Sequence, residues 1–136
     1  MVDASESGTD RLQRVLGRRF DDALRSIVVY TPNESRIHYL REDIDRDAAV
    51  GRLIRIEQLY HAERLNNTPL VHDPNLDRLH LSLFRFDGAV VVHLVDPGGA
   101  VVGFSLDPGT HVEVDQLTEF YEALFGDLPE SLRASD

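Results

Sequence analysis

The feature that most restricts the fold is a pair of apolar runs joined by Asp87-Gly88. Residues Leu79 to Phe86 precede this dipeptide, and residues Ala89 to Val95 follow it. An Asp-Gly pair between two such runs is a strong signal for a β-hairpin with a two-residue loop. A loop of that length places Leu83 opposite Val92, so the sequence predicts the register of the hairpin as well as its existence.

This register sorts the side chains of the hairpin onto two faces. One face is uniformly apolar and must be core; it holds Leu79, Leu81, Leu83, Val90, Val92 and Leu94. The other face is mixed; it holds His80, Ser82, Phe84, Phe86, Ala89, Val91, His93 and Val95. The mixed face carries too much apolar surface to stay in water. We therefore expect either a helix of the same chain or a second subunit to cover it.

A third strand is predicted at Ala100 to Leu106, after the turn residues Asp96-Pro97-Gly98-Gly99. A flush turn would direct Val102 and Phe104 to the mixed face. A three-residue loop with Gly99 in a left-handed bulge would direct them to the core. We favour the bulged loop, because Pro followed by two glycines suits it.

The rest of the chain alternates between helical and strand-like periodicity. Apolar spacing predicts helices and β-branched or aromatic runs predict strands. The predicted helices span 9–24, the stretch from Asp43 or Asp45 to Asn66-Asn67, and 114–125 with Gly126 near its end; the predicted strands are 26–31 and 36–41.

The predicted order is helix, two strands, helix, three strands, helix, which is an α+β domain. At 136 residues the chain has the length of one ordinary domain. We expect the domain over residues 9–127, with a disordered N-terminal tail at 1–8 and a flexible C-terminal tail at 128–136, because both ends are small and polar.

This element order resembles the Roadblock/longin/profilin-like group of small domains, over nearly the whole folded region. The resemblance implies a five-stranded antiparallel sheet with the two terminal helices on one face and the middle helix on the other. In Roadblock-type dimers the middle helix and the third strand meet their copies, which implies Leu79 to Phe86 and Arg52 to Tyr60 as a contact surface here. Its apolar members would be Leu79, Leu81, Phe84, Phe86, Ile56 and Tyr60.

The charge composition indicates the solvent. The chain has 24 Asp plus Glu against 14 basic residues, all of them Arg, and a formal net charge of -10. Dense carboxylates keep a surface hydrated in molar salt, where their mutual repulsion is screened. The composition resembles that of haloarchaeal proteins, and segments 27–43 and 86–108 resemble uncharacterised small haloarchaeal proteins. The alternative is an Arg-favouring, GC-rich genome with an incidentally acidic surface.

The chain has no Cys, which removes disulfides, thiolate catalysis and Cys-based zinc sites. No apolar run approaches the roughly 18 to 20 residues that span a membrane. The N-terminus also has no basic stretch followed by an apolar one, as a leader would have. We therefore expect a cytoplasmic protein without membrane contact.

His80 and His93 are the strongest candidates for chemistry. They fall on neighbouring strands and on the same predicted face, with Ser82 opposite His93. They could be a pair of metal ligands, or a general base with a positioned hydroxyl. No carboxylate of either strand joins them on that face. Hydrogen-bonded structural histidines are therefore the favoured interpretation.

A second conceivable site combines His61, His72 and Asp73, with Glu63 nearby, although solvated polar residues are the favoured interpretation.

The glycines at 98–99 and Gly103 lie between antiparallel strands rather than between a strand and a helix, so they do not form a dinucleotide fingerprint. We expect turn and bulge roles for them, with Gly103 allowing a helix to approach the sheet. No cofactor is expected.

Four arginines give the first predicted helix a basic side: Arg11, Arg14, Arg18 and Arg19. This side could bind nucleic acid or an acidic partner, or pair with neighbouring Asp residues as an ordinary solvated face. In molar salt the net charge says little about nucleic acid, because counterion release is weak there.

No catalytic constellation is visible, so we do not expect an enzyme. The favoured hypothesis is a non-enzymatic interaction or regulatory module that self-associates, most simply as a homodimer. One alternative is a small-molecule or ion sensor with a pocket near His80 and His93. The other is a nucleic-acid-associated regulator that uses the basic side of the first helix.

Overall fold

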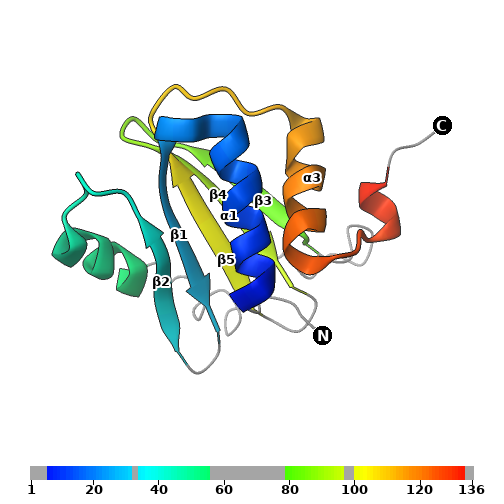
Figure 1. The fold of residues 1–136 in the computed structure, drawn as a ribbon, viewed down its shortest axis with the longest axis horizontal. Helices are drawn as coiled ribbons and strands as arrows, with labels where there is room; N and C mark the ends of the chain where they lie inside the picture. The colour runs from blue at the N-terminus through cyan, green and yellow to red at the C-terminus, as the bar shows by residue number, and fades with distance from the viewer. Residues whose placement is uncertain (1–5, 32–33, 56–78, 97–99, 134–136) are drawn as a thin grey trace.

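The computed structural model describes residues 6–31, 34–55, 79–96 and 100–133, which form a five-stranded antiparallel sheet with helices packed against it (Figure 1). The strands lie in the order β2-β1-β5-β4-β3. The elements are α1 (Glu6–Phe20), η1 (Asp21–Ala23), β1 (Leu24–Tyr30), β2 (Ser35–Leu40), helical residues 46–55, β3 (Leu81–Arg85), β4 (Val90–Val95), β5 (Val101–Leu106), α3 (Val114–Phe125) and η2 (Glu130–Leu132). The predicted α+β class and element order are confirmed.

The core lies between one face of the sheet and the two terminal helices. Figure 1 shows α1 and α3 side by side across that face, with the sheet behind them. The buried side chains of the core come from α1, α3 and the three inner strands: Leu12, Leu16, Leu24, Ile27, Val29, Val90, Val92, Leu94, Val102, Phe104, Leu106, Leu117, Phe120, Tyr121 and Leu124. All six residues of β5 are buried, as expected for the central strand of the sheet.

The register predicted for the β3–β4 hairpin is confirmed. Leu83 pairs with Val92, and Phe86 N donates a hydrogen bond to Ala89 O at 2.8 Å across the Asp87-Gly88 loop. Val90, Val92 and Leu94 are buried in the core, as the alternation requires.

β5 also presents the predicted residues to the core. Phe104 pairs with Val92 and Val102 pairs with Leu94, and both β5 side chains are buried. Asp96 N donates to Ala100 O at 2.8 Å, so three residues separate the paired ends of the strands. Gly99, for which the sequence predicts a left-handed conformation, lies outside the described residues.

Structured residues extend beyond both predicted ends of the domain. α1 begins at Glu6 rather than Thr9, and Gly8 and Thr9 are buried, so residues 6–8 belong to the helix rather than to a tail. At the other end Leu128 and Leu132 pack against the core, and Leu132 is the last residue of η2. The two leucines bury apolar surface in an otherwise polar segment, which ties it down.

The first helix also ends earlier than predicted. Its apolar spacing continues to Leu24, but α1 ends at Phe20, η1 follows, and Leu24 is already the first residue of β1. Asp21 has a φ of 48°, a left-handed conformation that Asp tolerates better than most residues. This reversal turns the chain from the helix into the sheet.

Asp45 caps the middle helix, in agreement with one of its two predicted starts. Its Oδ2 accepts a hydrogen bond from Ala48 N at 3.0 Å, and its carbonyl oxygen accepts one from Ala49 N at 3.0 Å. Residues 46–55 are helical and lie beside β2 (Figure 1). The predicted end of this helix at 66–67 and the connector at 70–77 lie outside the described residues.

Two register shifts interrupt the sheet on β1 and β2. The β1–β5 pairing passes from Leu24 to Ser26 and leaves Arg25 without a Cα partner on β5. The β1–β2 pairing leaves His38 out in the same way, and His38 Nε2 lies 3.0 Å from Asp10 Oδ1 of α1. Each bulge therefore changes the direction of one polar side chain, that of Arg25 on β1 and that of His38 on β2.

Gly103 accommodates a side chain rather than a helix. It pairs with His93 on β4, and a Cβ at position 103 would lie 2.7 Å from His93 Cδ2. The imidazole therefore packs directly against the backbone of β5 at Gly103, which has no side chain. The prediction that Gly103 lets a helix approach the sheet is wrong, because a histidine side chain occupies that space.

We expect Gly103→Ala to destabilise the fold by about 1–3 kcal/mol, because the new methyl group must displace a buried ring. Gly17→Ala is the matched control. Gly17 lies within α1 with no neighbour within 4 Å of a Cβ, so the same substitution there should stabilise by about 0.5–1 kcal/mol. Chemical denaturation in molar KCl measures both. Equal and small effects would contradict the close packing at His93.

Candidate functional site

A pocket of about 600 Å³ lies between the second face of the sheet and the helical residues 46–55. This is the face of the sheet for which the sequence predicts a mixture of apolar and polar side chains. The helix contributes Ala49, Arg52, Leu53 and Arg55 to the wall, so a helix of the same chain covers part of this face. The remaining described lining residues are Arg25, Ser26, Val28, Tyr30, Ile37, Leu40, Phe84, Phe86, Gly88, Ala89, Val91, His93, Gly103, Phe104 and Ser105.

The bulge in β1 places polar groups at one end of the pocket. Arg25 and Ser26 are consecutive, yet both line the pocket, because the register shift removes the usual alternation. Ser26 Oγ lies 2.6 Å from Ser105 Oγ on the neighbouring strand. Arg25 Nε is buried without a hydrogen-bond partner among the described residues. This end therefore brings Arg25, Ser26 and Ser105 together on a mostly apolar wall.

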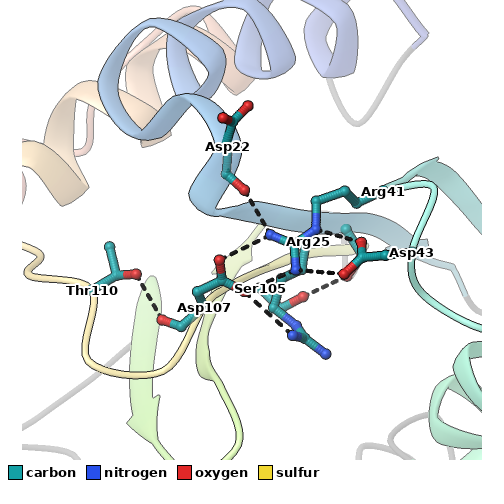
Figure 2. Close-up of polar contacts among 8 residues, drawn as sticks. Asp22, Arg25, Arg41, Asp43, Ser105, Asp107 and Thr110 are labelled. Atoms are coloured by element: carbon teal, nitrogen blue, oxygen red, sulfur yellow. Dashed lines mark hydrogen bonds and ion pairs between the residues drawn. The ribbon is translucent and has the colours of Figure 1, made fainter.

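Arg41 joins the chain segments around this end of the sheet (Figure 2). It follows β2, and its guanidinium donates to Asp107 Oδ2 at 2.9 Å and Oδ1 at 3.0 Å. It also donates to Asp43 Oδ1 at 2.6 Å and Oδ2 at 3.1 Å, and to Asp22 O at 2.6 Å. Arg25 Nη1 adds a longer bond to Asp107 Oδ1 at 3.4 Å. We call Arg25, Arg41, Asp43 and Asp107 the arginine cluster.

The arginine cluster keeps both of its carboxylates ionised. Hydrogen bonds from Arg41 hold the pKa of Asp107 below its usual value, with Arg25 adding to the effect. Hydrogen bonds from Arg41 likewise lower the pKa of Asp43, and the two carboxylates raise the pKa of Arg41. Two cations and two anions balance, so the cluster positions chain segments without a net charge.

His93 lies on the wall of the pocket between aromatic rings. Its ring centroid is 6.3 Å from that of Tyr30 and 5.6 Å from that of Phe84, and both contacts are edge-on. The residue is only 5% exposed. Burial lowers the pKa of His93 to about 4, so the imidazole is neutral at pH 7.

The structure places His80 in different surroundings. Its ring lies against Tyr121 of α3, with centroids 6.1 Å apart, whereas His93 lies against Tyr30 and Phe84. Ser82 pairs with His93 in the register that the sequence predicts. No group of three or more His, Asp or Glu side chains that could hold a metal ion occurs in the part of the chain that the structure describes. The other predicted set (His61, Glu63, His72 and Asp73) lies outside that part.

The basic side of α1 is partly engaged with α3. Arg11 Nε donates to Ala123 O at 3.0 Å, near the C-terminal end of α3. Arg19 forms two hydrogen bonds of 3.0 Å with the carboxylate of Glu119. Arg14 and Arg18 are exposed. Two of the four arginines therefore contribute to the packing of the helices.

The predicted contact surface is apolar and open on β3. The exposed fraction is 43% for Phe84, 61% for Phe86 and 49% for Leu79, which precedes the strand. The two phenylalanine rings stack with centroids 6.2 Å apart. Leu81 is partly buried and packs against the core. Ile56 and Tyr60 lie outside the described residues.

Sequence reasoning did not identify the arginine cluster or most of the pocket wall. Asp107 directly follows the predicted strand 100–106, and Arg41 was assigned only to the end of the predicted strand 36–41. A signal was present in the topology: strands that pair antiparallel bring the end of β2 and the end of β5 to the same end of the sheet. That signal becomes readable only once β1 is known to lie between them.

The fold and site define an α+β domain with a pocket on the open face of its sheet. The chain belongs to the family described as "Domain of unknown function (DUF7522)", whose model matches residues 10–126. A comparison with curated proteins finds no match. Within the described residues, no helix has the length and apolar character to cross a membrane.

We expect His93 to make stability depend on pH. Burial lowers its pKa from the ordinary 6.5 to about 4 in the folded state, so the unfolded chain binds the proton first as the pH falls. Stability is then lost between about pH 6.5 and 4, by at most about 3 kcal/mol. His93→Gln should flatten that part of the curve of unfolding free energy against pH.

His111→Gln is the control for this measurement, because the side chain of His111 is exposed. It should leave the pH dependence of the wild type in place. If His93→Gln follows the wild-type curve through the same pH range, burial of the neutral imidazole is not the cause of the acid sensitivity.

We expect Arg41→Lys to lower the free energy of unfolding by about 1 kcal/mol, because an ammonium cannot reproduce two bidentate contacts. Arg46→Lys, an exposed position at the start of the middle helix, should change it very little. Thermal and chemical denaturation in molar KCl give both values. A wild-type stability for Arg41→Lys would show that the arginine cluster does not hold these segments together.

Proposed function

We propose that this domain is a non-enzymatic interaction module that self-associates through the β3 edge of its sheet. The observation that carries the proposal is the end position of β3: it pairs with β4, and no other described strand pairs with it. Phe84 of this strand and Phe86, which directly follows it, are exposed to solvent. An exposed apolar edge strand is a template for pairing with another chain.

The hydrogen bonds of the hairpin indicate which backbone groups face outward. Phe86 N bonds to Ala89 O, and Val95 N bonds to His80 O. Bonded and non-bonded pairs alternate in an antiparallel ladder. The N–H and C=O groups of Leu81, Leu83 and Arg85 therefore point away from β4, where the β3 of a second copy could pair with them.

This arrangement agrees with the Roadblock-like dimer that the element order suggested, in which the third strand and the middle helix meet their copies. We place the module in a salt-accumulating, haloarchaeal cytoplasm on the basis of its acidic, Lys-free composition. High salt strengthens apolar association and screens the repulsion between two acidic copies. Such a solvent therefore favours this contact.

The test is the oligomeric state of two variants at one position. Arg85→Pro removes an outward N–H and blocks pairing at the edge, whereas it leaves the bonds to β4 intact. Arg85→Ala removes the same side chain, with its 3.2 Å bond to Thr110 O, and keeps the N–H. In molar KCl we expect sedimentation to give a dimer for the wild type and Arg85→Ala, and a monomer for Arg85→Pro.

Two results would overturn the proposal. One is a wild-type protein that remains a monomer at the highest concentration reached. The other is an Arg85→Pro variant that stays dimeric with a native far-UV spectrum, because association would then use another surface.

The pocket supports a second candidate function, the binding of a small molecule. Its volume of about 600 Å³ falls within the roughly 300–1,000 Å³ of known ligand pockets. Its wall is mostly apolar with a few polar groups, as in such sites. A nucleic-acid role has less support, because Arg11 and Arg19 already bond to α3.

A further inference from the structure

We infer that the pocket binds an amphipathic organic anion, a molecule with an apolar body and one acidic group. The inference deepens the second candidate function and depends on it, because it names the class of ligand for the same pocket. It does not require self-association. The charge of the pocket wall carries it.

The wall is positive in a strongly acidic protein. Asp and Glu number 24 in the chain against 14 Arg, yet the described residues of the wall include Arg25, Arg52 and Arg55 and no Asp or Glu. A surface that excludes carboxylates in such a chain is complementary to an anion. The ligand that fits this wall is therefore negatively charged.

Arg52 and Arg55 supply positive charge that no carboxylate among the described residues balances. Arg25 bonds to Asp107, whose carboxylate Arg41 shares. Arg52 and Arg55 are exposed on the middle helix, and neither forms an ion pair with another described residue. They are three positions apart, so they lie on one side of the helix and can reach one acidic group.

The rest of the wall suits an apolar body. Val28, Ile37, Leu40 and Val91 line it from the sheet, and the stacked rings of Phe84 and Phe86 are also part of the wall. His93 adds no charge to this wall at pH 7, since its burial keeps the imidazole neutral. A purely hydrophilic anion would leave these side chains without a partner.

Molar salt restricts how the charge can act. Long-range attraction is screened within a few ångströms at such ionic strength. A preference for an anion over a neutral ligand must therefore come from direct, charge-assisted hydrogen bonds to Arg52 and Arg55, the exposed arginines at the rim of the pocket. Such bonds depend on contact and not on the electrostatic field of the whole protein. The affinity for the anion should therefore depend on the guanidinium groups at the rim and not on Arg residues elsewhere.

Two fluorescent probes that differ by one group test the inference. 8-Anilino-1-naphthalenesulfonate carries a sulfonate on the apolar skeleton, and N-phenyl-1-naphthylamine is the same skeleton without it. In molar KCl we expect one sulfonate probe to bind per chain, about tenfold or more tighter than the neutral probe. A cooperative thermal transition for each sample shows that the probe reports a folded protein.

Variants then locate the site. The double variant Arg52→Gln/Arg55→Gln should weaken the sulfonate probe about tenfold or more and change the neutral probe less than about twofold. Arg14→Gln/Arg18→Gln on the opposite side of the sheet is the matched control, and it should change neither. Ala89→Phe fills the pocket from the sheet and should remove the binding of both probes.

The outcomes distinguish two questions: whether the pocket binds a small molecule, and whether it prefers an anion. If both probes bind equally and only Ala89→Phe removes them, the pocket is a ligand site and its preference for anions is wrong. If the α1 control weakens the sulfonate probe as much as the rim variant does, the preference is also wrong. If neither probe binds the folded wild type, the small-molecule function and the inference fall together.

Discussion

The structure depends on the burial of β5 along both of its faces. β5 lies between β1 and β4, and all six of its residues are buried. A strand of this kind needs cover on both sides of the sheet. α1 and α3 supply it on one side. On the other side Gly103 is covered by the ring of His93, and Ser105 lies at the pocket.

Much of the sheet could be predicted because its evidence is local. The Asp87-Gly88 loop defines the register of β3 with β4, and the length of the next loop defines that of β4 with β5. The two bulges could not be predicted, since nothing in the alternation around Arg25 or His38 marks them. The end of α1 was also misjudged, because the apolar spacing runs on into Leu24, which continues the core as a strand residue.

The candidate site was harder to predict, because residues far apart in the chain assemble it. Arg41 and Asp107 are 66 positions apart, and each has an ordinary local role at the end of a strand. The sequence did identify the half-apolar face and placed His93 on it. It could not show that the middle helix brings Arg52 and Arg55 to the same cavity, since that depends on how the helix stands over the sheet.

The pairing of β1 with β5 also has a kinetic consequence. The β1–β2 pair and the three strands β3, β4 and β5 are each joined by short loops, so each group can form from local contacts. The sheet is completed only when β1 pairs with β5, and Ser26 and Ser105 in that pair are 79 residues apart. The entropy of closing such a loop is lost before any contact across it forms. We therefore expect the docking of these two groups of strands to be the slow step of folding, and the core between the sheet and the helices α1 and α3 to be completed in that same step.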